Sequence, residues 1–207
     1  MNTLAAHGTD AGPQSLYGTM LGAALASLPP VLQRVHRAEG VHLRGTLRVR
    51  WSARRWLRAL MRLSALPRPT AAAPTLVTIS PEPAGERWHR SIGGHIVASR
   101  MRLARAGQVT ERMGPLAIVL ATRVDGTGRL WQASRGVSLF GLTVPWLHVL
   151  ASERARDAHS YRCDVRIWAP RLGYLLRYDG VLTIRDPELE PESEPESEPD
   201  TYLENVP

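Results

Sequence analysis

The chain has 207 residues, which is enough for one full hydrophobic core and too few for two comfortable domains. All 26 basic residues are arginine, the last being Arg185, and ten acids lie in 1–185 against nine in 186–207. The body therefore carries 26 − 10 = +16 and the final segment carries −9. This division indicates an anionic partner or shielding of the body by its own acidic segment.

The sequence contains no run of 18 apolar residues, which excludes a standard membrane-spanning helix. The apolar segment 19–28 lacks the preceding positive charge of a signal peptide, so we expect a cytoplasmic location. Cys163 is the only cysteine, which rules out an intramolecular disulfide and fits a reducing compartment.

The N-terminal part of the chain is expected to be helical. Residues 1–14 are polar and aperiodic and should be flexible. From Ser15 the apolar spacing predicts a helix that ends at Pro29, and a second short helix follows over 30–37.

The next segment combines a strand and a helix. Apolar and polar residues alternate over 41–51, which predicts a strand with one buried face and one arginine-rich face. An amphipathic helix should follow, with Ser52 as its N-cap and prolines 67 and 69 at its end. We expect residues 69–74 to form a linker-like loop.

From residue 75 onward the pattern is one of successive strands separated by glycine-containing turns. The expected strands are 76–81, 86–92, 95–104, 109–113, 116–124, 130–136, 160–168 and 174–184. Helices and strands do not alternate, so a parallel sheet is excluded. The predicted fold is α+β and mostly β: a curved antiparallel meander or partly closed barrel with two or three short N-terminal helices. It forms a single domain over 15–185, followed by a disordered Pro/Glu/Ser tail over 186–207.

Sequence motifs for dinucleotides, phosphate loops, zinc proteases and serine hydrolases are absent. His159 and Cys163 have no further ligands nearby and do not make a zinc site. We therefore assign no catalytic residue, no metal site and no cofactor.

Two polar strings are candidates for a binding site. On a strand, Glu86, Trp88 and Arg90 share one face, where they would line a polar pocket or form a cross-strand ion pair on a wet face. Arg177 and Tyr178 form the second string, near the last strand.

The isolated acids Glu111, Glu153 and Asp164 lie among arginines, so we interpret them as ion-pair partners in preference to general acids or bases. The basic body also suggests a nucleic acid or an anionic membrane surface as partner. The arginines are spread along the chain and no recognised module is present, so we expect neither to be the main partner.

Several short strings follow one another in a set order over residues 15–184. The most telling are Glu86-Arg87-Trp88-His89-Arg90 and Arg177-Tyr178-Asp179-Gly180-Val181-Leu182, with Gly93-Gly94 between them. Their order and spacing resemble a bacterial family, the domain of unknown function 4166. The chain departs from the family pattern at Ile92, where Phe is usual, and at Val181, where an aromatic is usual. The resemblance implies no established activity. Members also occur behind a saccharopine-dehydrogenase-like domain, which implies an NAD(P)-dependent oxidoreductase as partner.

We therefore expect a non-enzymatic domain that binds a small amphipathic or acidic ligand or accompanies an oxidoreductase. An apolar pocket would carry the polar side chains Glu86, Trp88, Arg90, Arg177 and Tyr178 near its mouth. Two alternatives stay open: a small hydrolase or isomerase that uses Glu86 or Asp164, and an arginine-rich protein that binds polyanions or a membrane surface.

Overall fold

The computed structural model describes residues 15–185 except 38, 63–65 and 106. The predicted flexible N-terminus, 1–14, and the predicted acidic tail, 186–207, lie outside the described residues.

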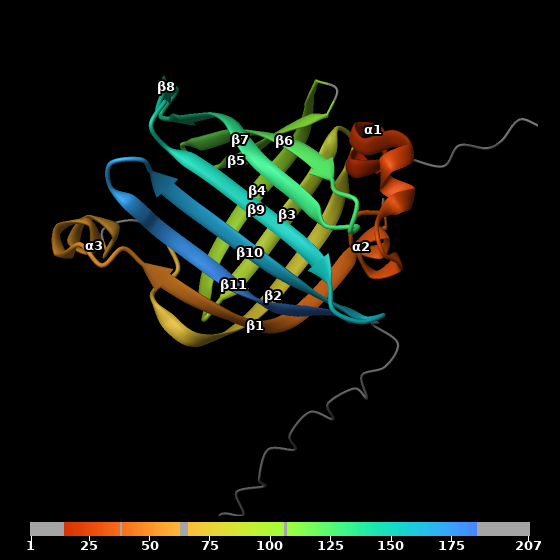
Figure 1. Ribbon diagram of the computed structural model, residues 1–207, viewed down its shortest axis with the longest axis horizontal. Helices are drawn as coiled ribbons and strands as arrows, with labels where there is room; N and C mark the ends of the chain where they lie inside the picture. The colour runs from red at the N-terminus through yellow and green to blue at the C-terminus, as the bar shows by residue number, and fades with distance from the viewer. Residues whose placement is uncertain (1–14, 38, 63–65, 106, 186–207) are drawn as a thin grey trace, which may run out of the picture.

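Two short helices and a 3₁₀ turn precede the sheet. Helix α1 (Leu16–Leu21) begins after Ser15, whose hydroxyl accepts a hydrogen bond of 2.9 Å from the Gly18 amide. A 3₁₀ helix (Gly22–Ser27) leads to α2 (Pro30–Val35), where proline occupies the first helical position. The apolar side chains of α1 and α2 are buried, and the two helices cover one end of the sheet (Figure 1). No helix in the described part of the chain is long and apolar enough to cross a membrane.

The strands are paired antiparallel throughout and close into a barrel (Figure 1). They are β1 (Val41–Trp51), β2 (Thr70–Glu82), β3 (Gly85–Ile92), β4 (His95–Arg105), β5 (Gln108–Met113), β6 (Leu116–Val124), β7 (Leu130–Leu139), β8 (Leu142–Thr143), β9 (His148–Ala155), β10 (Ser160–Ala169) and β11 (Gly173–Arg185). Pairing of β1 with β11 and of β6 with β7 closes a ring in which only the short β8 takes no part. The mostly β prediction is confirmed, and the sheet is fully closed.

Strand β9 was not predicted, and it is the element that lets the ring close, because it lies between β7 and β10. Its inward-facing side chains are Val149, Ala151, Glu153 and Ala155, of which the first three line the interior cavity. Alanine or glutamate occupies three of these four positions, so the alternation of large apolar and polar residues by which a strand is recognised in sequence is missing.

The prediction of a loop over 69–74 was wrong, because β2 already begins at Thr70. Alanine and proline are uncommon in strands, so this part of β2 was not recognised from the sequence, although it pairs with β1 through Ala73 and Leu47. Ser52 was predicted to be the N-cap of the next helix, but helix α3 (Arg55–Arg62) begins three residues after it. The Ser52 hydroxyl accepts a hydrogen bond from the Arg54 amide at 3.3 Å.

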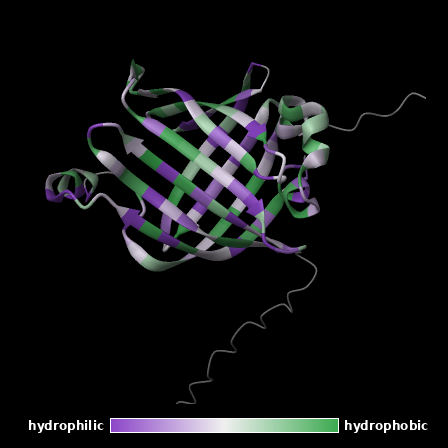
Figure 2. Ribbon diagram, viewed as in Figure 1, coloured by the Kyte–Doolittle hydropathy of each residue, from purple (hydrophilic) through white to green (hydrophobic). Residues whose placement is uncertain are grey.

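The two faces of each strand separate the barrel core from its outer surface. On β1, Leu43, Leu47 and Val49 are buried while the arginines between them are exposed, so polar and apolar residues alternate along the strands in Figure 2. Gly180 of β11 faces the interior, and a Cβ on it would collide with the backbone carbonyl of Thr46. A glycine there allows β1 and β11 to approach closely where the sheet curves.

Because all neighbours in the ring are antiparallel, successive connections alternate between its two ends. We call one end the helix-capped end; it carries α1, α2 and the connections 36–40, 83–84, 106–107, 125–129 and 156–159. We call the other the α3 end; it carries the connections 52–69, 93–94, 114–115, 140–147 and 170–172. In Figure 1 these ends lie to the right and to the left.

Candidate functional site inside the barrel

The barrel encloses a cavity of about 80 Å³ that is lined by polar as well as apolar side chains. Leucine, valine, isoleucine and methionine form much of its wall. The polar members of the wall come from α1 and from seven strands: Tyr17, Thr75, Arg90, Glu111, Gln132, Glu153, Tyr161, Cys163 and Tyr178. An apolar enclosure with a few convergent polar groups is the usual form of a small-molecule site.

Arg90 is the cation of this interior. Its guanidinium donates to the Glu111 carboxylate at 3.1 Å and to the Ser99 hydroxyl at 2.8 Å, and it lies 4.6 Å from the centroid of the Trp88 ring. Ser99 in turn donates to Glu111 at 2.7 Å. Burial by itself would lower the pKa of Arg90, but the negative charge of Glu111 outweighs it and holds that pKa above its ordinary value. The arginine therefore remains charged inside the barrel.

A second polar cluster lies toward the helix-capped end. His36, at the end of α2, is fully buried and its Nε2 lies 2.8 Å from the Glu153 carboxylate. The ring of Tyr17 lies 3.9 Å from that of His36, and the Tyr17 hydroxyl accepts from Gln132 at 3.1 Å. Through these contacts Tyr17 of α1 and His36 at the end of α2 join the two N-terminal helices to polar side chains of the barrel interior.

Glu86 belongs to this second cluster. One carboxylate oxygen accepts from the Trp88 indole N–H at 3.0 Å, while Oε1 is buried without a hydrogen-bond partner, as is Nδ1 of His36. Burial raises the pKa of Glu86, and the neighbouring His36 and the bond from Trp88 only partly oppose this effect. A raised pKa favours the protonated carboxyl, which is the form that can donate a hydrogen bond or act as a general acid.

The tyrosine and cysteine side chains of the wall are held neutral. Burial raises the pKa of Cys163 to about 12 and that of Tyr178 well above its ordinary value. The pKa values of Tyr161 and Tyr17 are raised for the same reason. The wall thus combines neutral hydroxyl and thiol groups with one permanent cation, Arg90, and the side chains of Glu111 and Glu153.

Three of the five predicted site residues, Trp88, Arg90 and Tyr178, line the cavity. Glu86 shares the inner face of β3 with Trp88 and Arg90, as the period of two predicts, but it lies beyond the cavity lining. Arg177 points the other way. Grouping it with the mouth of the pocket was wrong, because successive residues of a strand face opposite sides of the sheet.

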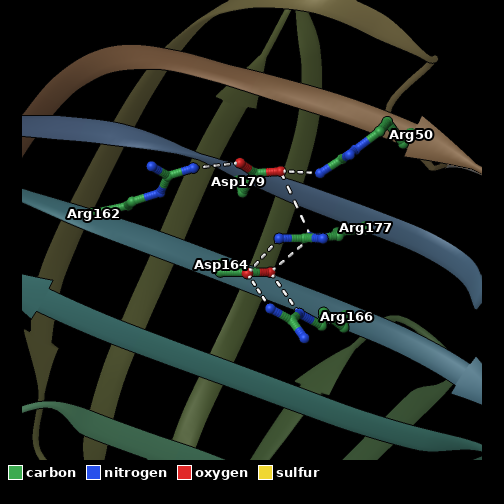
Figure 3. A network of polar contacts seen from close by, with 6 residues as sticks. All are labelled: Arg50, Arg162, Asp164, Arg166, Arg177 and Asp179. Atoms are coloured by element: carbon green, nitrogen blue, oxygen red, sulfur yellow. Dashed lines mark hydrogen bonds and ion pairs between the residues drawn. The ribbon is translucent and has the colours of Figure 1, made fainter.

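Arg177 belongs instead to a network on the outer wall (Figure 3). Its guanidinium donates to both oxygens of Asp164, at 3.1 and 2.7 Å, and lies 3.7 Å from Asp179. Arg166 also binds Asp164, while Arg50 and Arg162 bind Asp179 at 2.6 and 2.9 Å. The six charges thus form a chain of ion pairs across three strands, β1, β11 and β10.

Asp164 has no access to the cavity and serves as an ion-pair partner. Burial would raise its pKa, but the hydrogen bonds from Arg166 and Arg177 outweigh that effect and hold the pKa below its ordinary value. Of the two carboxylates proposed as a general base, only Glu86 lies inside the barrel.

Tyr17, His36 and Gln132 were not predicted to be residues of the interior. Tyr17 and Gln132 are separated by 115 residues, so only the closed barrel brings them together. His36 was predicted only as part of a short helix, and its partner Glu153 lies on strand β9, which was not predicted. Within the described residues, no group of three His, Cys, Asp or Glu side chains is arranged to hold a metal ion.

The fold and its interior define a closed antiparallel barrel, capped by helices, that encloses a small polar cavity. The model of the family named domain of unknown function, DUF4166, matches residues 28–182, and the chain belongs to this family. The matched region contains both strings on which the resemblance was based, and it ends just before the barrel does. No curated protein and no solved structure shows significant similarity to the chain.

Proposed function

We propose that the barrel binds a small acidic molecule, with its anionic group held at Arg90. The supporting observation is a charged guanidinium placed at the wall of an enclosed cavity, where burial disfavours it. A buried ion pair is weak evidence for stability, because hydrophobic replacements often fold at least as well. A charged group in a cavity is therefore a candidate for binding.

The surroundings of Arg90 suit recognition of an anion. A guanidinium has five N–H donors in a rigid fork, so Arg90 can hold Glu111 and Ser99 and still donate to a ligand. The neutral hydroxyl of Tyr178 and the ring of Trp88 lie on the same wall. These groups offer N–H and O–H donors to a ligand carboxylate, beside the Glu111 carboxylate that Arg90 already binds.

The size of the cavity limits the ligand. A volume of about 80 Å³ has room for roughly three water molecules at about 30 Å³ each, or for a short carboxylate such as acetate or propionate. It lies well below the roughly 300 Å³ at which pockets begin to accept drug-sized ligands. A longer chain would require α1 and α2 to move away from the end that they cover.

A calorimetric titration with a series of straight-chain carboxylates, from acetate to octanoate, tests this proposal. We expect affinity to be highest for the shortest acids and to fall by about tenfold or more in Arg90→Lys, which keeps the charge and loses the fork. Arg177→Gln is the matched control, since that arginine lies on the outer face, and its affinity should equal that of the wild type. Absence of heat with every acid, or equal loss in both variants, would count against binding inside the barrel.

A second candidate function uses the outer wall. A groove of about 220 Å³ crosses β7, β9, β10 and β11, and its lining contains five arginines and one acid: Arg129, Arg154, Arg162, Arg166, Arg177 and Asp164. Trp131 lies in the same groove, with Arg129 at 5.0 Å from its ring centroid. Such a surface suits a polyanion such as heparin.

Binding of heparin to this groove should weaken steeply with added salt, because each neutralised anion releases counterions. Arg154→Gln should weaken it, and Arg44→Gln, on the outer face of β1, should not. Salt-independent affinity would argue against this second function.

A further inference from the structure

The most exposed large apolar side chains are gathered at one end of the barrel. Nine such side chains are exposed in the described part of the chain, and the six most exposed all lie in or within two residues of the connections of the α3 end. They are Phe140 (78%), Leu142 (74%), Ile96 (62%), Trp56 (55%), Tyr174 (55%) and Trp146 (53%). Scattered single apolar residues are normal on a surface, but their collection at one end marks an interaction site.

Phe140 combines an exposed side chain with an unfavourable backbone conformation. It is the only phenylalanine of the chain and the one described residue other than glycine with a positive φ, at 51°. That conformation is strained for a bulky residue, and the exposed ring recovers little by packing. A side chain that strains the backbone and stays exposed is suited to contact with a partner.

The two ends differ in charge. The connections of the α3 end contain six arginines, all exposed, and no Asp or Glu: Arg54, Arg55, Arg58, Arg62, Arg68 and Arg171. In the connections of the helix-capped end three arginines are balanced by three acids: Arg37, Arg129 and Arg156 against Glu39, Asp125 and Asp157. Strand β11 also ends there, and the nine acids of 186–207 follow it in sequence.

We propose that the α3 end docks on an anionic lipid bilayer, with the aromatic and aliphatic side chains in the interface and the arginines at the lipid phosphates. Tryptophan and tyrosine rings favour the interface, and long arginine side chains reach phosphate while their stems stay in apolar surroundings. The helix-capped end, whose connections carry no net charge, would then face away from the negative membrane. This inference is independent of the ligand at Arg90.

The fold explains why the sequence did not favour a membrane surface. The six arginines come from two connections separated by more than 100 residues, and the apolar side chains come from four. The alternation of antiparallel connections places them at the same end only when β9 is counted, because without β9 the connection 170–172 would fall at the opposite end. A nucleic acid would satisfy the arginines but offers no apolar phase for Phe140, Leu142 and Ile96.

Vesicle co-sedimentation tests the proposal with the full chain. We expect binding to phosphatidylcholine vesicles that contain phosphatidylglycerol, weak binding to phosphatidylcholine alone, and loss of binding as salt rises. The double variant Phe140→Gly/Leu142→Ser should bind at least about tenfold more weakly, because two exposed apolar side chains leave the interface. Glycine is at ease at positive φ, so this variant should fold at least as well as the wild type.

Matched variants distinguish vesicle binding through the α3 end from nonspecific hydrophobic or electrostatic binding. Leu76→Ser/Leu103→Ser removes two exposed leucines that lie outside the α3-end connections, and it should bind as the wild type does. Arg55→Gln/Arg58→Gln should lose affinity for the anionic vesicles, whereas Arg44→Gln/Arg48→Gln, on the outer face of β1, should lose much less.

Two results would overturn the proposal. One is equal vesicle binding by Phe140→Gly/Leu142→Ser and by the leucine control. The other is a full chain that binds neither kind of vesicle; the α3 end would then be left for a protein partner such as an oxidoreductase.

Discussion

Removal of the Arg90 guanidinium would reveal how strongly the barrel interior is shielded from water. The side chains of Arg90 and Glu111 are 15% and 12% exposed, and the ion pair between them measures 3.1 Å. Arg90→Met keeps an apolar stem in place and removes the charge. The carboxylate of Glu111 is then left largely buried, with the Ser99 hydroxyl as its remaining donor.

The expected loss follows from the charge that is left unpaired. Removing one partner of a buried ion pair costs roughly 3–5 kcal/mol, so we expect Arg90→Met to lower the free energy of unfolding by about 3–5 kcal/mol at pH 7. Adding Glu111→Gln removes the stranded charge, so the double variant should lie within about 1–2 kcal/mol of the wild type.

Urea unfolding followed by tryptophan fluorescence at pH 7 measures these differences. A deficit of the single variant below about 1 kcal/mol would refute a desolvated pair. A double variant as unstable as the single one would refute it equally.

Three further predictions concern other parts of the interior. Gly180→Ala should cost about 1–3 kcal/mol or more, because its Cβ would collide with the Thr46 carbonyl, while Gly136→Ala, with open space around it, should change thermal unfolding little. Burial raises the pKa of the Cys163 thiol from 9.0 to about 12. At pH 8 this thiol should therefore react with a disulfide reagent about a thousandfold more slowly in the folded than in the unfolded chain. Rapid reaction of the folded protein would contradict the burial of Cys163. The folded state binds the proton of Glu86 more tightly than the unfolded state does, so this group stabilises fully below pH 4.5 and loses its contribution as pH rises through the folded pKa. Glu86→Gln should therefore flatten the stability profile above pH 4.5, and profiles that stay parallel to the wild type would exclude the raised pKa.

The period of two was sufficient to predict part of the interior. Glu86, Trp88 and Arg90 could be placed on one face because strand β3 is continuous and all three lie inside. The same rule places Arg177 and Tyr178 on opposite faces of β11, so the prediction that both line one pocket was inconsistent with it. Local pattern thus determines which side of the sheet a residue faces.

Closure of the ring could not be predicted in the same way. It depends on β9, whose inward positions include Ala151 and Glu153 and therefore lack an apolar stripe. Once β9 is absent from the predicted set, β7 and β10 have no common neighbour, and the sheet appears open. The partnership of Glu153 with His36 and the position of the connection 170–172 at the α3 end both depend on β9, so neither was accessible from sequence.

The position of a bound acid tests the central claim most directly. NMR with methyl-labelled propionate reports which aromatic protons lie near the ligand methyl group. Binding inside the barrel predicts contacts with the rings of Trp88 and Tyr178, which line the cavity, and none with Trp131 of the outer groove. Contacts with Trp131 alone, or none at saturating propionate, would contradict a ligand site inside the barrel.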